Sequence, residues 1–388
     1  MRFPEFSEEW ERSSLGVVFC KVENGLTYDP NNSEGLPVTR IETISDRSIN
    51  YKRVGYAKDD GKLSKYKMEP GDILFSHINS LKHIGKTAYY DGEHPLYHGM
   101  NLLLLRTTNE ESARFLFYQL NTSRFLHRCQ VLANQAVNQA SINTRELKGI
   151  TLHKPSIKEQ IKIADFISLL DNRIATQIKI IEKLESLIRG LITDVNSGRI
   201  AQCESVYLRD LLTERHEKNT NNYEVCSVSV SQGVINQIDY LGRSFAAKEV
   251  LHYNVVNCGD IVYTKSPTGE FPYGIVKRSD ITKPVAVSPL YGVYRPINDY
   301  VGKYLHLYFK SPINAKNYLH KLIQKGAKNT INITNQHFLD NKILIPEKGW
   351  LENIVNFAAA IEIKIATENK VLQTLQQQKD YLLSKMFI

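Results

Sequence analysis

A tripeptide that recurs half a chain length later constrains the fold of this protein to an internal duplication. Ile174-Ala175-Thr176 reappears as Ile365-Ala366-Thr367, an offset of 191 residues (365 − 174 = 191) in a chain of 388. Four apolar matches keep this offset: Ile163 with Ile354, Phe166 with Phe357, Leu184 with Leu375, and Leu191 with Leu382. A repeat in such register indicates two copies of one structural unit.

Each copy contains one long helix. Lys154-Pro155 breaks the preceding pattern, Pro155 and Ser156 suit the start of a helix, and Asn196-Ser197-Gly198 suits its end. Roughly 38 residues at a rise of about 1.5 Å give a helix of about 57 Å, which is longer than most helices of a single domain.

Seam residues in both helices follow alternating steps of four and three, the spacing of a coiled coil. The seam consists of Leu170, Ile174, Gln177, Ile181, Leu184, Ile188 and Leu191 in the first helix, and Ile361, Ile365, Glu368, Leu372, Leu375, Lys379 and Leu382 in the second. Each helix therefore needs a partner, and the other copy is the simplest one. The equivalent polar positions Gln177 and Glu368 either fix the register or lie in an exposed stretch.

Two globular segments alternate with these helices. Both read as mixtures of strands and helices, and Gly71-Asp72-Ile73 in the first is echoed by Gly259-Asp260-Ile261 in the second. The predicted fold class is α/β (α+β). The predicted order is a globule at 1–152, a helix at 153–198, a globule at 199–343 and a helix at 344–388.

Charge and cysteine content narrow the functional class. The net charge of +8 favours an anionic partner such as nucleic acid, although a mildly basic solvated surface is the alternative. The five cysteines are scattered without a Cys-x-x-Cys pair, which indicates a reducing cytosol. Residues 1–10 lack an apolar core and no run of about 18 apolar residues occurs, so we expect a soluble, cytoplasmic protein.

Motifs for catalysis are missing from the sequence. There is no G-x-G-x-x-G, no Walker loop, and no Asn/Asp-Pro-Pro-aromatic element of the kind that holds the target amine in DNA methyltransferases. Glu362-Ile363-Lys364 matches the Glu-x-Lys of metal-dependent nucleases, but it lies on a predicted helix, where a solvated pair is the simpler interpretation. His77 and His83 lack a third ligand at a suitable spacing, so no metal site is predicted.

Polar and basic loops supply the candidate DNA contacts. Segment 76–86 combines short polar side chains with cations, and segment 134–139 is rich in amides that can pair bidentately with adenine. Segment 324–330 occupies the corresponding place in the second globule. Each segment has an ordinary surface loop as its alternative. The candidate residues are His77, Asn79, Lys82, Lys86, Asn134, Gln135, Asn138, Gln139, Lys265, Gln324, Lys325, Lys328, Asn329 and Thr330.

The whole pattern resembles the specificity subunit of Type I restriction-modification systems. The globule and helix order, Gly35-Leu36-Pro37 and both Gly-Asp-Ile elements carry this resemblance. Its most specific part is the helix entry Pro155-Ser-Ile-Lys-Glu-Gln160, which runs into Ile163-Ala-Asp-Phe166 and Leu170-Asp171. The second helix departs from the pattern at Glu347-Lys-Gly-Trp-Leu351.

The resemblance implies two target-recognition domains that each read one half of a bipartite, asymmetric DNA site, held apart by two antiparallel coiled-coil helices. It implies double-stranded DNA, two modification (methyltransferase) subunits and restriction (endonuclease and translocase) subunits as partners. The chain itself is then a non-catalytic subunit without a cofactor. S-adenosylmethionine, ATP and Mg would serve the partners, which methylate adenine and cut. The alternatives are a non-catalytic coiled-coil adaptor and a diverged DNA-modifying enzyme.

Overall fold

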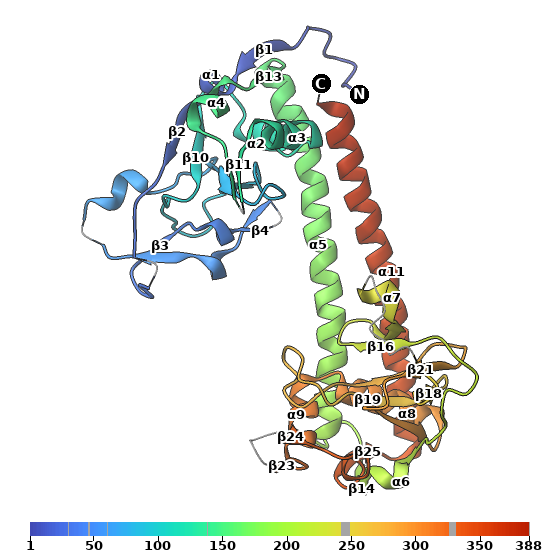
Figure 1. Cartoon of the computed structure of the whole chain (residues 1–388). Coiled ribbons are helices and arrows are strands. Elements are labelled where there is room, and N and C mark those ends of the chain that lie inside the picture. Colours follow the sequence, from blue (N-terminus) through green and yellow to red (C-terminus); the bar gives the residue numbers. More distant parts are fainter. Residues whose placement is uncertain are drawn as a thin grey trace. The chain divides into compact units, whose positions relative to one another are not determined.

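The computed structural model describes residues 1–29, 31–45, 47–59, 61–137, 139–241, 249–325 and 331–387. The chain divides into unit 1 (Met1–Ile178 and Lys370–Ile388) and unit 2 (Lys179–Asn369). Two long helices, α5 (Ile157–Asn196) and α11 (Lys348–Met386), contribute residues to both units. Figure 1 labels the elements and colours them along the chain.

Local sequence sets the ends of α5. The backbone N–H of Gln160 donates to the carbonyl of Ser156 at 3.0 Å and closes the first turn. Glu159 lies in that first turn, where its negative charge suits the positive end of the helix dipole. Beyond the last turn, Gly198 has φ +71°, a left-handed conformation that glycine adopts easily and that ends the helix.

Unit 1 is built on an antiparallel four-stranded sheet in the order β2 (Phe19–Asn24), β10 (Leu103–Thr107), β7 (Ile73–Phe75) and β9 (Thr87–Tyr89). Alternate residues of β7 enter different clusters. Ile73 and Phe75 pack with α2 (Ala113–Leu120) and α3 (Ser123–Leu132), whereas Leu74 joins a second cluster. Both faces of the central strands are therefore buried.

Unit 2 repeats this sheet with the order β15 (Leu212–Glu214), β22 (Gly292–Pro296), β19 (Ile261–Tyr263) and β20 (Val276–Arg278). The helices α8 (Asp299–Phe309) and α9 (Pro312–His320) follow it as α2 and α3 follow the sheet of unit 1. The ring of Phe338 stacks on Tyr263 and Tyr294, with centroids 4.6 and 4.9 Å apart, at the centre of the core.

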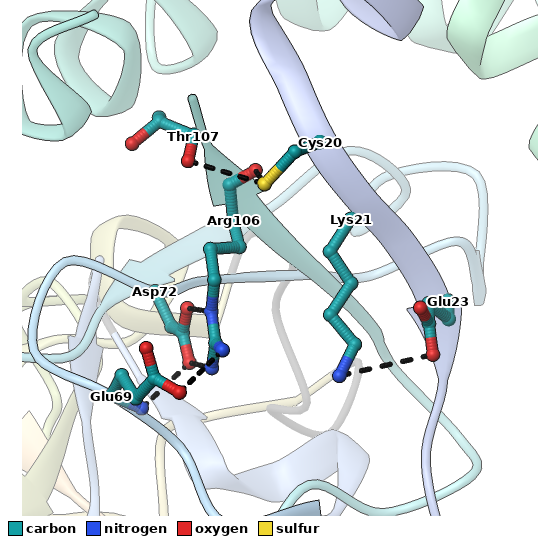
Figure 2. Close-up of polar contacts among 7 residues, drawn as sticks. All are labelled: Cys20, Lys21, Glu23, Glu69, Asp72, Arg106 and Thr107. Atoms are coloured by element: carbon teal, nitrogen blue, oxygen red, sulfur yellow. Dashed lines mark hydrogen bonds and ion pairs between the residues drawn. The ribbon is translucent and has the colours of Figure 1, made fainter. Parts of the chain in front are cut away.

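The Gly-Asp turn is the same in both units. Gly71 and Gly259 have φ +98° and +91°, and each next residue is an almost fully buried aspartate. Asp72 receives Arg106 Nε at 2.7 Å and Arg106 Nη2 at 2.7 Å, as Figure 2 shows. Asp260 receives Nε and Nη2 of Arg215 at 2.7 and 3.1 Å. The predicted internal repeat is thus confirmed in three dimensions.

Shorter elements complete unit 1. They are β1 (Glu11–Ser14) paired with β13 (Thr151–Lys154), α1 (Leu15–Val18), β3 (Leu36–Val38) paired with β6 (Gly55–Ala57), β4 (Ile44–Ser45) paired with β5 (Ser48–Ile49), α4 (Thr144–Gly149), the sheet of β8 (Ile78–Asn79), β12 (Gln139–Ser141) and β11 (Asn134–Ala136), and the 3-10 turns η1 (Ile41–Thr43), η2 (Tyr51–Arg53) and η3 (Leu63–Tyr66).

Unit 2 has its own set of shorter elements. It comprises β14 (Cys203–Tyr207) paired with β25 (Lys342–Pro346), α6 (Leu208–Leu211), β16 (Cys226–Ser229) paired with β17 (Gly233–Asn236), α7 (Gln237–Leu241), β18 (Asn254–Val256) paired with β21 (Val285–Val287), β23 (Gln324–Lys325) paired with β24 (Ile331–Asn332), and α10 (Asn335–Phe338).

The two long helices pack antiparallel within each unit. In unit 1 the start of α5, at Ile163 and Ile167, shares a core with Leu383 and Met386 near the end of α11. In unit 2 the end of α5, at Ile188, Ile192 and Val195, shares a core with the start of α11, at Leu351 and Ile354. This confirms the predicted antiparallel pairing, and all fourteen seam residues are buried or half-buried.

Of the helices in the described ranges, none combines the length and the apolar character that crossing a bilayer requires.

Candidate nucleic-acid interface

A three-stranded sheet in unit 1 brings the two polar candidate segments together. The central strand β12 pairs on one side with β11 and on the other side with β8. Ala140 of β12 therefore lies opposite both Gln135 and Asn79. Residues directly opposite each other in neighbouring strands project from the same face, so Asn79 and Gln135 flank Ala140 on one face.

The β11–β12 ribbon is exposed over most of its length. All three residues of β11 are exposed, Gln139 is exposed, and Val137 at the turn is 99% exposed. Asn138, the remaining candidate of this turn, lies outside the described residues. A two-stranded ribbon is narrow enough to enter the major groove of DNA, where amide side chains can read base edges.

The turn after β8 carries the cations. Lys82 and Lys86 are both exposed, and neither forms an ion pair with any residue in the described ranges. The turn itself is held closed because the N–H of Gly85 donates to the carbonyl of Ser76 at 2.9 Å. Asn79 supports the same turn, since its amide donates to Ser76 Oγ at 3.1 Å. The two lysines are therefore free to contact an anion.

His77 lies inside unit 1, apart from the exposed candidates. Its Nε2 receives the Asn24 amide at 3.2 Å, and burial lowers its pKa to about 4, so the ring is neutral near pH 7. A neutral, buried ring does not supply positive charge to a phosphate. Its carbonyl, however, accepts the N–H of Ile142 at 2.9 Å and so anchors the end of β12 next to β8.

The candidates of unit 2 are only partly described. Gln324 lies opposite Asn332, and Lys325 lies opposite Ile331, in the two-stranded ladder of β23 and β24. Lys328, Asn329 and Thr330 lie outside the described residues. Lys265 is half-buried two positions beyond β19, the place that His77 occupies after β7, and burial lowers its pKa.

Exposed apolar residues on the long helices form a second feature of the surface. Phe166 and Phe357, related by the repeat, are 39% and 50% exposed, and the related residues Ile180 and Val371 are 38% and 39% exposed. Large apolar side chains left in solvent often mark contacts with other proteins. The sequence contained this signal, because Phe166 and Phe357 match in the repeat, but a match alone does not distinguish core from surface.

The part of the chain that the structure describes holds no cluster of three or more His, Cys, Asp or Glu side chains able to bind a metal ion. The two charged residues of Glu362-Ile363-Lys364 are engaged in ion pairs. Glu362 Oε1 lies 3.2 Å from Lys310 Nζ, and Lys364 pairs with Glu368 one turn further along the helix. These contacts agree with a solvated helix surface.

Residues 7–186 match the family model of the Type I restriction modification DNA specificity domain. The chain is 42% identical over 193 residues to the putative type I restriction enzyme MjaX specificity subunit of Methanocaldococcus jannaschii, a match covering 48% of this chain and 45% of that protein. It is 24% identical over 194 residues to the type I restriction enzyme StySPI specificity subunit of Salmonella potsdam, covering 48% of this chain and 40% of that protein. The match spans less than half the length of either relative.

Two solved structures share the fold over nearly the whole chain. The crystal structure of the Type-I restriction-modification system S subunit from M. genitalium superposes with a TM-score of 0.57 at 13% identity and covers 100% of this chain and 99% of that one. A second structure, from work on complex assembly and conformational transition of the type I R-M system, superposes with a TM-score of 0.54 at 12% identity. The match covers 98% of each chain. The fold expected from the resemblance is confirmed.

Proposed function

Because residues 7–186 match the family model of the Type I restriction modification DNA specificity domain, we propose that this chain selects the DNA site of a Type I restriction-modification complex. The observation that carries the proposal is the β8-β12-β11 sheet of unit 1, in which exposed amides lie on β11 and β12 and two exposed lysines lie in the turn after β8. The chain would recognise a bipartite, asymmetric site and direct adenine methylation and restriction by partner subunits.

Recognition divides between the lysines and the amides. Lys82 and Lys86 suit contacts to backbone phosphates, which position a protein on DNA without reading its sequence. Gln135, Gln139 and Asn134 suit base edges, and each bidentate pair with adenine supplies roughly 1–3 kcal/mol of discrimination. Val137 adds an apolar tip that suits the methyl group of thymine.

The two units share a scaffold but differ in the segments that would read DNA. Both keep the Gly-Asp turn and the same sheet order. The ribbon of unit 1 is rich in amides, Asn134-Gln135-Ala136, whereas the matching segment of unit 2 contains lysines, Gln324-Lys325-Gly326-Ala327-Lys328. Two unlike readers would produce two unlike half-sites, which supports an asymmetric target.

Chemistry would be left to partner subunits. The exposed residue pairs Phe166 with Phe357 and Ile180 with Val371 follow the internal repeat, so the same apolar feature occurs twice. This supports docking of two copies of one partner, the modification subunit. In this proposal the chain is non-catalytic, and S-adenosylmethionine, ATP and Mg are used by the modification and restriction subunits.

The test is a genome-wide map of methylated adenine in cells that carry this chain and a matching modification subunit, compared with cells that lack only this chain. We expect a split motif that appears only with the chain. The double variant Q135A/Q139A should relax one half of the motif, whereas N109A, which removes an exposed amide outside this sheet, should leave both halves unchanged.

If the complex assembles and no motif appears, the chain acts as an adaptor. If the purified chain alone modifies or cuts DNA in the presence of magnesium and S-adenosylmethionine, it is an enzyme. A motif that is unaltered in Q135A/Q139A would remove the ribbon from the recognition surface while leaving the function in place.

A further inference from the structure

A basic cavity in unit 2 is not used by the proposed function. Its volume is about 370 Å³, and it lies between the segment before β17, strand β20 and helix α8. The polar groups that line it share the ability to donate hydrogen bonds or to carry positive charge. They include Ser231, Gln232, Lys277, Arg278, His306 and Lys310.

Lys277 is the unusual member of this set. It lies in the middle of β20, where its backbone pairs with Val262, and it is 4% exposed, yet its ammonium group makes no hydrogen bond or ion pair with a residue in the described ranges. Burying an ammonium group without a partner is strongly unfavourable. Burial, followed by the charge of Lys310, lowers the pKa of Lys277 to about 8, so most molecules still carry the charge near pH 7.

The other cations near Lys277 are already matched with carboxylates. Arg278 pairs with Asp280 and with Asp299, the latter at 2.5 Å. Asp299 also pairs with Lys303 at 2.7 Å, and Lys310 Nζ lies 3.2 Å from Glu362 Oε1, so three cations match three carboxylates. Within the described part of the chain, Asp280 is the only carboxylate that lines the cavity. No negative charge therefore balances Lys277.

Further groups around the cavity also favour an anion. The Nε of Arg278 is buried and has no hydrogen-bond partner. His306 accepts the N–H of Arg278 at Nδ1, at 3.2 Å, and is kept neutral because burial and three nearby cations lower its pKa to about 3. Since Nδ1 is the acceptor, the neutral ring of His306 carries its proton on Nε2, which is a hydrogen-bond donor.

We propose that this cavity binds a phosphate group, with Lys277 as its main cationic contact and Lys310, which also pairs with Glu362, as the second. Phosphate oxygens accept hydrogen bonds from ammonium groups and from hydroxyl and amide donors such as those of Ser231 and Gln232. The anion would supply the charge that Lys277 lacks. Its source is either a DNA backbone phosphate or a free phosphate compound, and the site does not depend on the proposed function.

The test measures thermal unfolding of the full chain in increasing inorganic phosphate, with chloride adjusted to hold ionic strength constant. A ligand that binds only the folded state raises the unfolding midpoint in proportion to the logarithm of its concentration. We expect this rise in the wild type and in K316M, which removes an exposed lysine of unit 2, and its loss in K277M. K310M, altered at a half-exposed position, should also lose it and serves if K277M does not fold.

A second measurement separates the two sources. If the anion belongs to DNA, K277M in the assembled complex should weaken binding to all duplexes alike and reduce the slope of log affinity against log salt by about 1. If the anion is free, DNA affinity stays unchanged and only the phosphate-dependent rise disappears. The proposed site would be overturned if phosphate stabilised the wild type, K277M and K310M equally and DNA affinity stayed unchanged. That result would leave the methylation map, and with it the proposed function, unaffected.

Discussion

The arginine that neutralises the buried aspartate comes from a different strand in each unit, and this exchange predicts which arginines are essential. In unit 1 it is Arg106 on β10, next to Asp72 and Glu69 (Figure 2). In unit 2 it is Arg215, directly after β15. Arg295 on β22 occupies the strand position of Arg106, yet it is exposed. From its strand position alone, Arg295 would be expected to stabilise unit 2 by pairing with Asp260. In the structure Arg215 makes that pair instead.

The expected energies follow from burial. The side chain of Asp72 is 1% exposed. Besides the two hydrogen bonds from Arg106, its carboxylate accepts one from the backbone N–H of Glu69 at 2.8 Å, and R106M would leave that bond in place. Removing one partner of a buried pair costs about 3–5 kcal/mol, so R106M should lower the free energy of unfolding by that amount. D72N should cost less, about 1–3 kcal/mol, because Arg106 is 24% exposed and retains Glu69 at 2.6 Å.

The same reasoning applies to unit 2, where R215M should cost about 3–5 kcal/mol because Asp260 is 2% exposed. R295M should stay within about 0.5 kcal/mol of the wild type, as expected for an exposed side chain. Urea denaturation followed by hydrogen exchange and mass spectrometry measures the loss and assigns it to peptides of one unit. The reasoning fails if R295M destabilises unit 2 as much as R215M, or if R106M costs less than D72N.

Three further results are expected. Burial lowers the pKa of His98 to about 4, as it does for His77, below the ordinary 6.5, so unfolded chains bind these protons first. Unit 1 should therefore lose up to about 1.4 kcal/mol per pH unit for each of the two rings as pH falls from 6.5 to 4, and H98Q should remove about half of that slope in pH-dependent urea titrations. F338A should destabilise unit 2 by about 3–5 kcal/mol in calorimetry, against less than about 0.5 for L290A at a 73% exposed position. F166S/F357S should weaken binding of the proposed modification subunit by about 30-fold, with a small fall in the unfolding midpoint because the ring of Phe166 also packs edge-on against Phe3. F166S alone should remove one of two bound copies by light scattering, and full retention of both copies would exclude these phenylalanines.

The duplication and the long helices could be predicted because their signals are local and repeated. Pro155 lies just before α5 and Gly198 just after it, so they mark its two ends. The seam spacing repeats over several turns, and neither signal depends on the rest of the fold. The fold class and the antiparallel pairing followed from these signals together with the resemblance.

The polar sheet of unit 1 could not be predicted in the same way. Strands β8, β11 and β12 have two or three residues each, too few for an alternating pattern, and β8 is paired with a strand that lies about sixty residues later in the chain. For the same reason the burial of His77 was not visible, because it depends on contacts such as the one with Asn24. The sequence also did not show that Asp72 pairs with Arg106 of β10, whereas Asp260 pairs with Arg215 and not with Arg295 of β22. An arginine at either place can neutralise the buried aspartate.

The division of the chain into units has a consequence for its synthesis. Unit 1 contains residues 1–178, but Leu383, Met386 and Phe387, which complete its core, are made about 190 residues later. At a translation rate of about 5–20 residues per second, the roughly 190 residues of unit 2 delay completion of unit 1 by about 10–40 s. During that interval the apolar face around Ile163 and Ile167 lacks its partner helix. Unit 2, whose residues are contiguous in the chain, has no such interval between the two parts of its core.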